Sequence, residues 1–420
     1  MRPRLLLSIV VGLVAVVGLQ QAAGCASAEP AASVPEAALV LVSIDGFRYD
    51  YFDRADAETP TLDLLVAQGV RAERLVPVYP TKTFPNHYSL VTGLHPEAHG
   101  IVGNTMRDPE RTVDGEPARF SLSDREAVVD GRWWGGEPIW VTAERQGLRA
   151  ATAFWPGSEA EIAGVRPTHW LPYDGDMPYA DRVDQALAWL DGPEPARLVT
   201  LYFEGVDTAG HRFGPDTPET AAAIEAVDAA LGRLVDGLAE RGLLATTDLV
   251  VVSDHGMAPV SPERRVYLDD AIDIEAVDEV VWGEAAGVWH GRADPDSLVS
   301  AINALPHVAA YRREDTPPRL HYRDNPRIPP VVAIPDEGWT VSSRGYAERN
   351  PERPSGGAHG YDNRAASMHG VFVASGPHVR AGEETGPIST VDVYGVLAQI
   401  LGVEAAPNAG DPYVAERVLR

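Results

Sequence analysis

Acidic and histidine side chains follow three apolar runs of this sequence, and their types suit a metal-dependent reaction. They are Asp45 after VLVSI, Glu204, Asp207 and His211 after LVTLYF, and Asp254 and His255 after LVVVS. Carboxylates and imidazoles are the ligands that zinc and similar divalent metals prefer. Each residue alone also has an ordinary structural role open to it, because an Asp after a strand often caps a turn and an Asp–His pair four residues apart can lie on a surface helix. We therefore predict a metal site from the whole set.

A threonine near a predicted helix start is a candidate nucleophile. Pro85 and Gly93 fit the first turn and the end of a helix in the segment 79–93. A threonine before such a start can be a simple cap, or it can be a nucleophile where phosphate is favoured by the helix N-terminus. A bound metal would activate its hydroxyl at neutral pH. The pattern alone leaves both roles open, and it does not choose between Thr81 and Thr83.

His359 is a further candidate, because it lies in the glycine-rich segment GGAHG, where the backbone can approach a ligand closely. The alternative is an incidental histidine in a flexible loop. We expect structural or surface roles for the remaining histidines, which are His87, His95, His99, His169, His290, His307, His321, His369 and His378.

These side chains need a scaffold that brings the ends of several strands together. Continuous apolar runs predict buried strands at residues 38–44, 150–155, 198–203, 249–252 and 371–374. Helical spacing separates them, with predicted helices at residues 61–68, 218–241 and 389–401. The alternation predicts an α/β fold with a mostly parallel sheet flanked by helices, and ligands then bind beyond the carboxyl ends of the strands. Residues 259–344 contain several prolines and no long helical pattern, so we predict an inserted α+β lobe there.

Composition excludes one class of partner. The 420 residues include 61 acidic and 35 basic side chains, which give a formal net charge of −26. A protein that holds long nucleic acids needs the opposite balance, so we exclude such partners. A small anionic substrate remains compatible, because metal cations can reverse the field inside one cleft. We expect a monomer.

The first residues predict export. Arg2 and Arg4 precede an apolar run at residues 5–19, and Cys25 is the one cysteine of the chain. This pattern is typical of a signal peptide over residues 1–24 with a lipidated Cys25, followed by a tether over residues 26–37 and a catalytic domain over residues 38–420. A cut after Ala28 would instead release the protein without a lipid. Either route predicts a periplasmic or cell-surface protein without an intramolecular disulfide.

The motifs together resemble the nucleotide pyrophosphatase/phosphodiesterase (NPP) family of the alkaline phosphatase superfamily. The matching segments run in family order over most of the chain, and they are VSIDGFR at 42–48, the stretch 79–104, GEPIWVT at 136–142, FWPGS at 154–158, DTAGH at 207–211, SDHGM at 253–257 and HGYDN at 359–363. The resemblance implies an alkaline-phosphatase-like core.

The resemblance also implies roles for individual residues and two zinc ions. It assigns one zinc to Asp207, His211 and His359, and the second to Asp45, Asp254 and His255 with the hydroxyl of Thr83 beside it. It favours Thr83 over Thr81 as the nucleophile. For the substrate it implies a hydrogen bond from Asn104 to a phosphoryl oxygen, a base held between Phe84 and Tyr173, and a contact from Lys82.

The implied activity is hydrolysis of phosphodiester or pyrophosphate bonds in nucleotides through a phospho-threonine intermediate, with release of a nucleoside 5′-monophosphate. Two alternatives stay open, a phosphomonoesterase of the same superfamily and a phosphodiesterase that acts on choline lipid headgroups. A sulfatase is disfavoured because Thr83 cannot become the required aldehyde. A surface protein without activity is disfavoured because the six ligands and the nucleophile are all present.

Overall fold

The structure is a computed structural model that describes residues 38–420. The predicted signal peptide, the lipidated Cys25 and the tether lie outside the described residues and stay predictions. Within residues 38–420, no helix has the length and apolar character that a membrane span requires.

An eight-stranded sheet forms the centre of the described chain, in the order β19-β2-β18-β9-β1-β8-β6-β7. Its strands are β1 (Ala38–Ile44), β2 (Val70–Ala72), β6 (Ala150–Ala153), β7 (His169–Leu171), β8 (Leu198–Phe203), β9 (Thr247–Val252), β18 (Phe372–Ser375) and β19 (Glu383–Thr385). Strand β1 pairs in parallel with both β8 and β9, and β18 runs antiparallel to its two neighbours. The predicted α/β fold with a mostly parallel sheet is confirmed.

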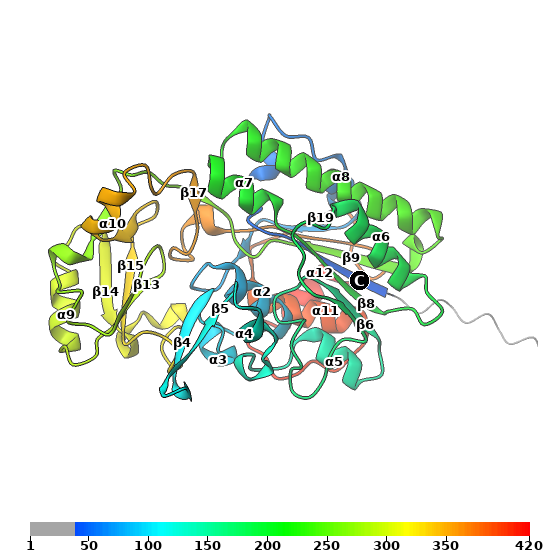
Figure 1. Cartoon of the computed structure of the whole chain (residues 1–420). Helices are drawn as coiled ribbons and strands as arrows, with labels where there is room; N and C mark the ends of the chain where they lie inside the picture. Colours follow the sequence, from blue (N-terminus) through cyan, green and yellow to red (C-terminus); the bar gives the residue numbers. More distant parts are fainter. Residues whose placement is uncertain (1–37) are drawn as a thin grey trace, which may run out of the picture. The chain divides into compact units, whose positions relative to one another are not determined.

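Both faces of this sheet are covered, as continuous apolar strands require. Alternate residues of β1 show this, because Leu39 and Leu41 belong to one hydrophobic core and Val40 and Val42 to the other. Helices α6, α7 and α8 lie on one side, and α2, α5 and α11 lie on the opposite side (Figure 1). Their bounds are α2 (Thr83–Thr92), α5 (Ile139–Arg145), α6 (Tyr179–Leu190), α7 (Gly205–Phe213), α8 (Pro218–Glu240) and α11 (Val393–Leu401), and α1 (Pro60–Gln68) packs with the α6–α8 side.

The hairpin of β4 (Thr105–Val113) and β5 (Glu116–Ser121) was not predicted from the sequence. Its strands are rich in charged residues and lack the apolar alternation that usually identifies a strand. Asp114 and Gly115 form its turn with positive φ angles of 54° and 88°. An Asp-Gly pair is a common two-residue hairpin turn, so that dipeptide was the available signal.

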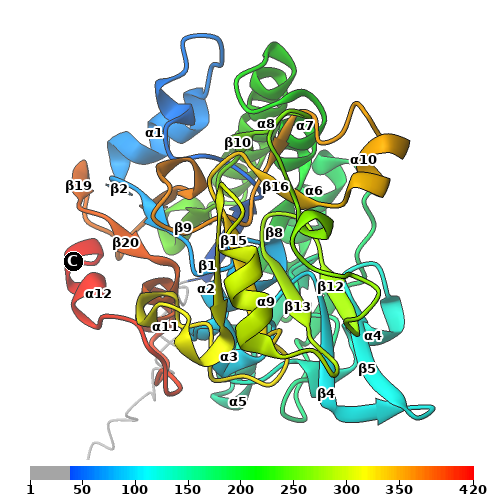
Figure 2. The same cartoon turned by 90° about the vertical axis from the view of Figure 1, so that its left-hand side faces the viewer.

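A second, antiparallel sheet lies beside this hairpin (Figures 1 and 2). Its order is β12 (Glu279–Val281), β13 (Ala286–Trp289), β15 (Val331–Pro335) and β14 (Val308–Arg312), with helix α9 (Pro295–Ile302) against it. It has its own hydrophobic core, which includes Val288 and Ile302. Arg119 of β5 donates to both carboxylate oxygens of Glu279 of β12, at 2.8 and 2.9 Å, and this links the two segments.

Candidate active site

The carboxyl ends of three adjacent strands position most of the predicted metal ligands. Asp45 follows β1, Asp254 follows β9, and α7 begins directly after β8. Since β8 and β9 flank β1, these ends meet at one edge of the sheet. The glycine after Asp45 allows the close approach, because a Cβ at Gly46 would lie 2.8 Å from the Cα of Asp207.

The side chains form two groups of three, and within each group the ligand atoms lie within 4.8 Å of one another. One group is Asp207, His211 and His359, and the other is Asp45, Asp254 and His255. Asp207 and His211 are one turn apart on α7, so they face the same direction. His359 directly follows β17 (Gly357–Ala358). Strand β17 pairs with β10 (Ala258–Pro259), which comes shortly after the loop that contains Asp254.

Backbone carbonyls set the tautomer of the three histidines in these two groups. In each ring, Nδ1 lies within hydrogen-bond distance of a carbonyl oxygen, at 2.8 Å for His211 to Gly357, 2.9 Å for His255 to Gly256 and 2.8 Å for His359 to Thr81. A carbonyl only accepts, so Nδ1 carries the proton and Nε2 of the neutral ring keeps its lone pair. This is the arrangement found in histidines that bind metals.

Two lone pairs face each other in the first group, because Nε2 of His211 and Nε2 of His359 lie 3.1 Å apart. One buried carboxylate oxygen lacks a hydrogen bond in each of Asp45, Asp207 and Asp254. Such contacts are unfavourable unless a cation lies between the atoms. The residues present therefore fit two divalent cations, one in each group.

Burial also shifts the pKa values of the carboxyl groups in the site. Burial raises the pKa of Asp45 well above its usual range, and the neighbouring Asp254 and Asp207 add to the shift. Burial also raises the pKa of Asp207. Carboxyl groups held in this way bind protons or cations readily, and clusters of perturbed carboxylates are typical of functional sites.

A second layer of hydrogen bonds orients the ligands. The hydroxyl of Tyr202 donates to Oδ2 of Asp45 at 2.6 Å. Behind Asp254 lies His87, which was expected to have only a structural or surface role. Its Nδ1 donates to the carbonyl of Thr83 at 2.9 Å and lies 3.3 Å from Oδ2 of Asp254, and its Nε2 lies 2.8 Å from the hydroxyl of Ser43. The signal for His87 was its position four residues after Thr83 in a helix.

The two candidate threonines have different surroundings. Thr81 is fully buried, and its hydroxyl donates to the carbonyl of Tyr361 at 3.0 Å and accepts from the amide of Gly360 at 2.9 Å. Thr83 is the first residue of α2, and its Oγ1 lies 3.4 Å from Nε2 of His255. Thr81 therefore has a structural role, and Thr83 presents its hydroxyl to the ligand group.

A cavity of about 320 Å³ opens over Thr83. Thr83, Phe84, Asn104 and Tyr173 all line it, together with ligands of both groups. The side-chain Oδ1 of Asn104 accepts from the amide of Phe84 at 2.9 Å, and this leaves the Nδ2 amide as a donor. The ring of Tyr173 is 44% exposed, so an aromatic ligand could stack on it.

Lys82 lies outside the boundary of this cavity and borders a neighbouring one. Its Nζ forms an ion pair of 3.0 Å with Glu284, which precedes β13 in the second sheet. The sequence offered no signal for this pairing, because the two residues are 202 positions apart.

Glu204 also follows β8, but it does not belong to either group of ligands. It binds Arg182, a fully buried side chain that also donates to the carbonyl of Tyr202 at 2.9 Å. This ion pair holds the end of β8 in place, directly before α7, which carries Asp207 and His211.

Replacing Arg182 by methionine is expected to lower the free energy of unfolding by roughly 3 kcal/mol, because the change leaves Glu204 and a buried carbonyl without their partner. Denaturant titration measures the loss. The matched control is Arg233→Met, since Arg233 pairs with Asp184 where both side chains are about half exposed, and its loss should be much smaller because solvent screens the pair. Equal losses in the two variants would contradict the structural role of Arg182.

Comparison with known proteins identifies the family. The model of the Type I phosphodiesterase / nucleotide pyrophosphatase family matches residues 39–362. An uncharacterized pyrophosphatase/phosphodiesterase of Schizosaccharomyces pombe is 39% identical over 90% of this chain and 79% of its own length. Ectonucleotide pyrophosphatase/phosphodiesterase family member 5 of Homo sapiens is 37% identical over 89% of this chain and 76% of its own. The chain covers 46% of a venom phosphodiesterase of Macrovipera lebetinus, at 37% identity.

Solved structures agree with this result. The murine ectonucleotide pyrophosphatase/phosphodiesterase 5 superimposes with a TM-score of 0.84 at 35% identity, over 92% of this chain and all of the murine chain. A second murine structure is an inactive threonine-to-alanine variant in complex with AMP. Both the sequence match and the fold are those of one enzyme family. The chain therefore belongs to the nucleotide pyrophosphatase/phosphodiesterase family of the alkaline phosphatase superfamily.

Proposed function

We propose that this protein is an exported enzyme that hydrolyses phosphodiester or pyrophosphate bonds of nucleotides, with Thr83 as the covalent nucleophile. One observation carries the proposal, the hydroxyl of Thr83 at the start of α2 beside two groups of three metal ligands. Two divalent cations bound there, which we take to be zinc from the ligand types, would favour the alkoxide and neutralise phosphoryl charge.

The chain's own residues account for the remaining chemistry. Oγ1 of Thr83 forms a bond to phosphorus, and the bond from phosphorus to the leaving oxygen breaks. The hydroxyl proton passes to solvent, and the leaving oxygen gains a proton. Water then attacks the phospho-threonine diester, which restores the hydroxyl and releases a nucleoside 5′-monophosphate. Nδ2 of Asn104 donates to a non-bridging phosphoryl oxygen, where negative charge develops.

The nucleoside part of the substrate fits the cavity over Thr83. Phe84 and Tyr173 line it, and we infer that a base stacks between them. The AMP complex of the murine relative supports a nucleotide as ligand. The ion pair of Lys82 with Glu284 argues against the monoesterase alternative, because a doubly charged monoester needs a cation that is not already neutralised.

Hydrolysis of three p-nitrophenyl esters tests the function. They are the ester of thymidine 5′-monophosphate, p-nitrophenyl phosphate and p-nitrophenyl phosphorylcholine. We expect the nucleotide diester to have the highest kcat/KM. A preference for the monoester would make the chain a phosphatase, and a preference for the choline ester would make Phe84 and Tyr173 walls of a headgroup pocket.

Asn104→Asp is expected to lower kcat on the nucleotide diester by about 10²-fold or more. The aspartate can still accept from the amide of Phe84, so the fold of the loop is preserved. It loses the Nδ2 donor and adds a negative charge near the phosphoryl group. Steady-state kinetics measure the loss of turnover, and the melting temperature shows whether the variant is still folded. Wild-type kcat in a folded Asn104→Asp protein would exclude Asn104 from transition-state stabilisation.

A further inference from the structure

The loop before β13 brings the mostly buried carboxylate of Glu284 to the segment that holds the ligand His359. Oε2 of Glu284 forms the ion pair of 3.0 Å with Nζ of Lys82, and Oε1 accepts from the hydroxyl of Thr340 at 3.1 Å. The side chains of Glu284 and Lys82 are only 12% and 21% exposed. Because solvent screens such a pair weakly, each charge has a large effect on its surroundings.

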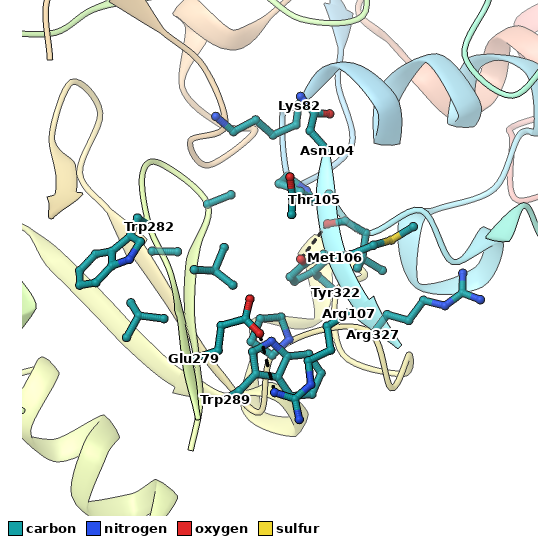
Figure 3. Close-up of a pocket in the computed structure, with 18 of the residues that line it drawn as sticks. Lys82, Asn104, Thr105, Met106, Arg107, Glu279, Trp282, Trp289, Tyr322 and Arg327 are labelled. Atoms are coloured by element: carbon teal, nitrogen blue, oxygen red, sulfur yellow. Dashed lines mark hydrogen bonds and ion pairs between the residues drawn. The ribbon is translucent and has the colours of Figure 1, made fainter. Parts of the chain in front are cut away.

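This ion pair lies against Gly360, the residue that follows His359. A Cβ at Gly360 would lie 2.4 Å from Cε of Lys82, 2.9 Å from its Nζ and 3.2 Å from Cβ of Glu284, so a residue without a side chain is needed here. The side chain of Lys82 points away from Asn104, toward the second sheet (Figure 3). The ammonium group is therefore placed beside the backbone that carries a metal ligand.

The charge of Lys82 acts on the first group of ligands. Burial lowers the pKa of His359 well below its usual range, and the charge of Lys82 adds to the shift. Burial raises the pKa of Asp207, and the charge of Lys82 is among the effects that oppose this rise. A positive charge that acts on these ligands would also repel a divalent cation bound by them.

The two groups of ligands differ in the negative charge that they can set against this repulsion. The first contains one carboxylate, Asp207, beside two histidines, whereas the second contains the carboxylates of Asp45 and Asp254 beside one histidine. The neutral rings of the first group leave part of the charge of a divalent cation unbalanced. A free ammonium group nearby would add to that charge, and the carboxylate of Glu284 neutralises it.

We propose that Glu284 is a positioning residue, which holds and neutralises Lys82 and thereby strengthens the binding of the cation in the first group. The inference rests on the proposed function, because it concerns a cation that the reaction needs. It gives the second sheet a role in the metal site, although the six ligands lie outside that sheet. The effect is electrostatic, so it depends on the charges of both partners.

The zinc affinities of wild-type and Glu284→Gln protein, measured by competition with a chromophoric chelator, test this role. Glutamine keeps the size of the side chain and can still accept from Thr340, but it leaves Lys82 with an unbalanced charge. We expect the affinity for the first cation to fall about ten-fold, because loss of a residue that supports a metal site has effects of roughly 10–100-fold.

The matched control is Asp108→Asn, which should retain both zinc affinities. Asp108 pairs with Arg327 at 3.0 Å, and their side chains are shielded to a similar degree, with 9% and 14% exposed. A second control locates the effect. In a His359→Ala background, which lacks a ligand of the first group, Glu284→Gln should leave the affinity for the remaining cation unchanged.

Variants of Lys82 separate charge from structure. The double variant Lys82→Met/Glu284→Gln removes both charges, so its affinity for the first cation should return close to the wild-type value. Lys82→Met alone removes the repulsion and keeps the carboxylate of Glu284, so it should bind the first cation more tightly than the wild type does. A purely structural role of the ion pair predicts weaker binding in both variants. Melting temperatures show which variants are folded.

Unchanged zinc affinity in folded Glu284→Gln protein, or a loss that the double variant does not restore, would overturn the inference. Weaker binding by Lys82→Met would overturn it even if Glu284→Gln does not fold. In either case, two bound cations and hydrolysis of the thymidine diester by the wild type would leave the proposed function intact. If the wild-type protein binds no divalent cation, the proposed function fails, and the inference fails with it.

Discussion

Thr83→Ala protein is expected to fold like the wild type and to lose at least about 10³-fold in kcat on the thymidine diester, since removal of a covalent nucleophile has effects of this size or larger. The hydroxyl of Thr83 makes its one described side-chain contact with Nε2 of His255 at 3.4 Å, so its removal leaves the packing of α2 unchanged. Steady-state kinetics measure the loss. Single-turnover experiments with a substrate that is labelled in its phosphoryl group test for the covalent intermediate.

Two further threonine variants serve as controls for the nucleophile. Thr83→Ser retains a hydroxyl and should keep more activity than Thr83→Ala. Thr81→Ala should instead reduce stability, by about 1–3 kcal/mol, because its hydroxyl accepts from the buried amide of Gly360 and donates to the carbonyl of Tyr361. Normal turnover by Thr83→Ala would remove Thr83 from the mechanism, and loss of the intermediate in Thr81→Ala alone would assign the nucleophile to Thr81.

Removal of bound metal by a chelator is expected to abolish hydrolysis and to lower the melting temperature. Without cations, the lone pairs of His211 and His359 face each other at 3.1 Å, and buried oxygens of three carboxylates lack partners. Metal that binds only the folded state adds about 4 kcal/mol when its free concentration is ~1,000 times Kd. Calorimetry with and without chelator, followed by titration with zinc, manganese or magnesium, measures both effects.

The variant His359→Ala provides the control for metal removal. It lacks one ligand of the first group, so the chelator should shift its melting temperature less than that of the wild type. The added metal that restores both activity and stability at the lowest concentration identifies the preferred ion. An identical melting temperature before and after complete metal removal would contradict the proposal that cations stabilise the two groups.

Local sequence patterns were sufficient for the scaffold and for much of the ligand set. Apolar runs identify β1, β8 and β9, because a strand buried on both faces is mostly apolar along its length. The polar residues that follow them, Asp45 and Asp254, are therefore found at strand ends, and in a parallel sheet these ends meet at one edge. The glycine-rich segment had already made His359 a candidate, and the family resemblance assigned it to the group of Asp207 and His211 and favoured Thr83 over Thr81.

Tertiary structure decided how these groups work together, because the deciding contacts join segments far apart in the chain. The backbone carbonyl of Thr81 accepts from Nδ1 of His359 across 278 positions, and this contact fixes the imidazole tautomer. The hydroxyl of Thr81 contacts Gly360 and Tyr361, and these contacts give Thr81 its structural role. Lys82 meets Glu284 only because the second sheet packs beside the hairpin that begins at Thr105. The neighbouring cavity that Lys82 borders arises from the same packing. Sequence patterns report local periodicity and the burial of single elements, whereas the pairing of charges and the shape of a cavity depend on how distant elements pack.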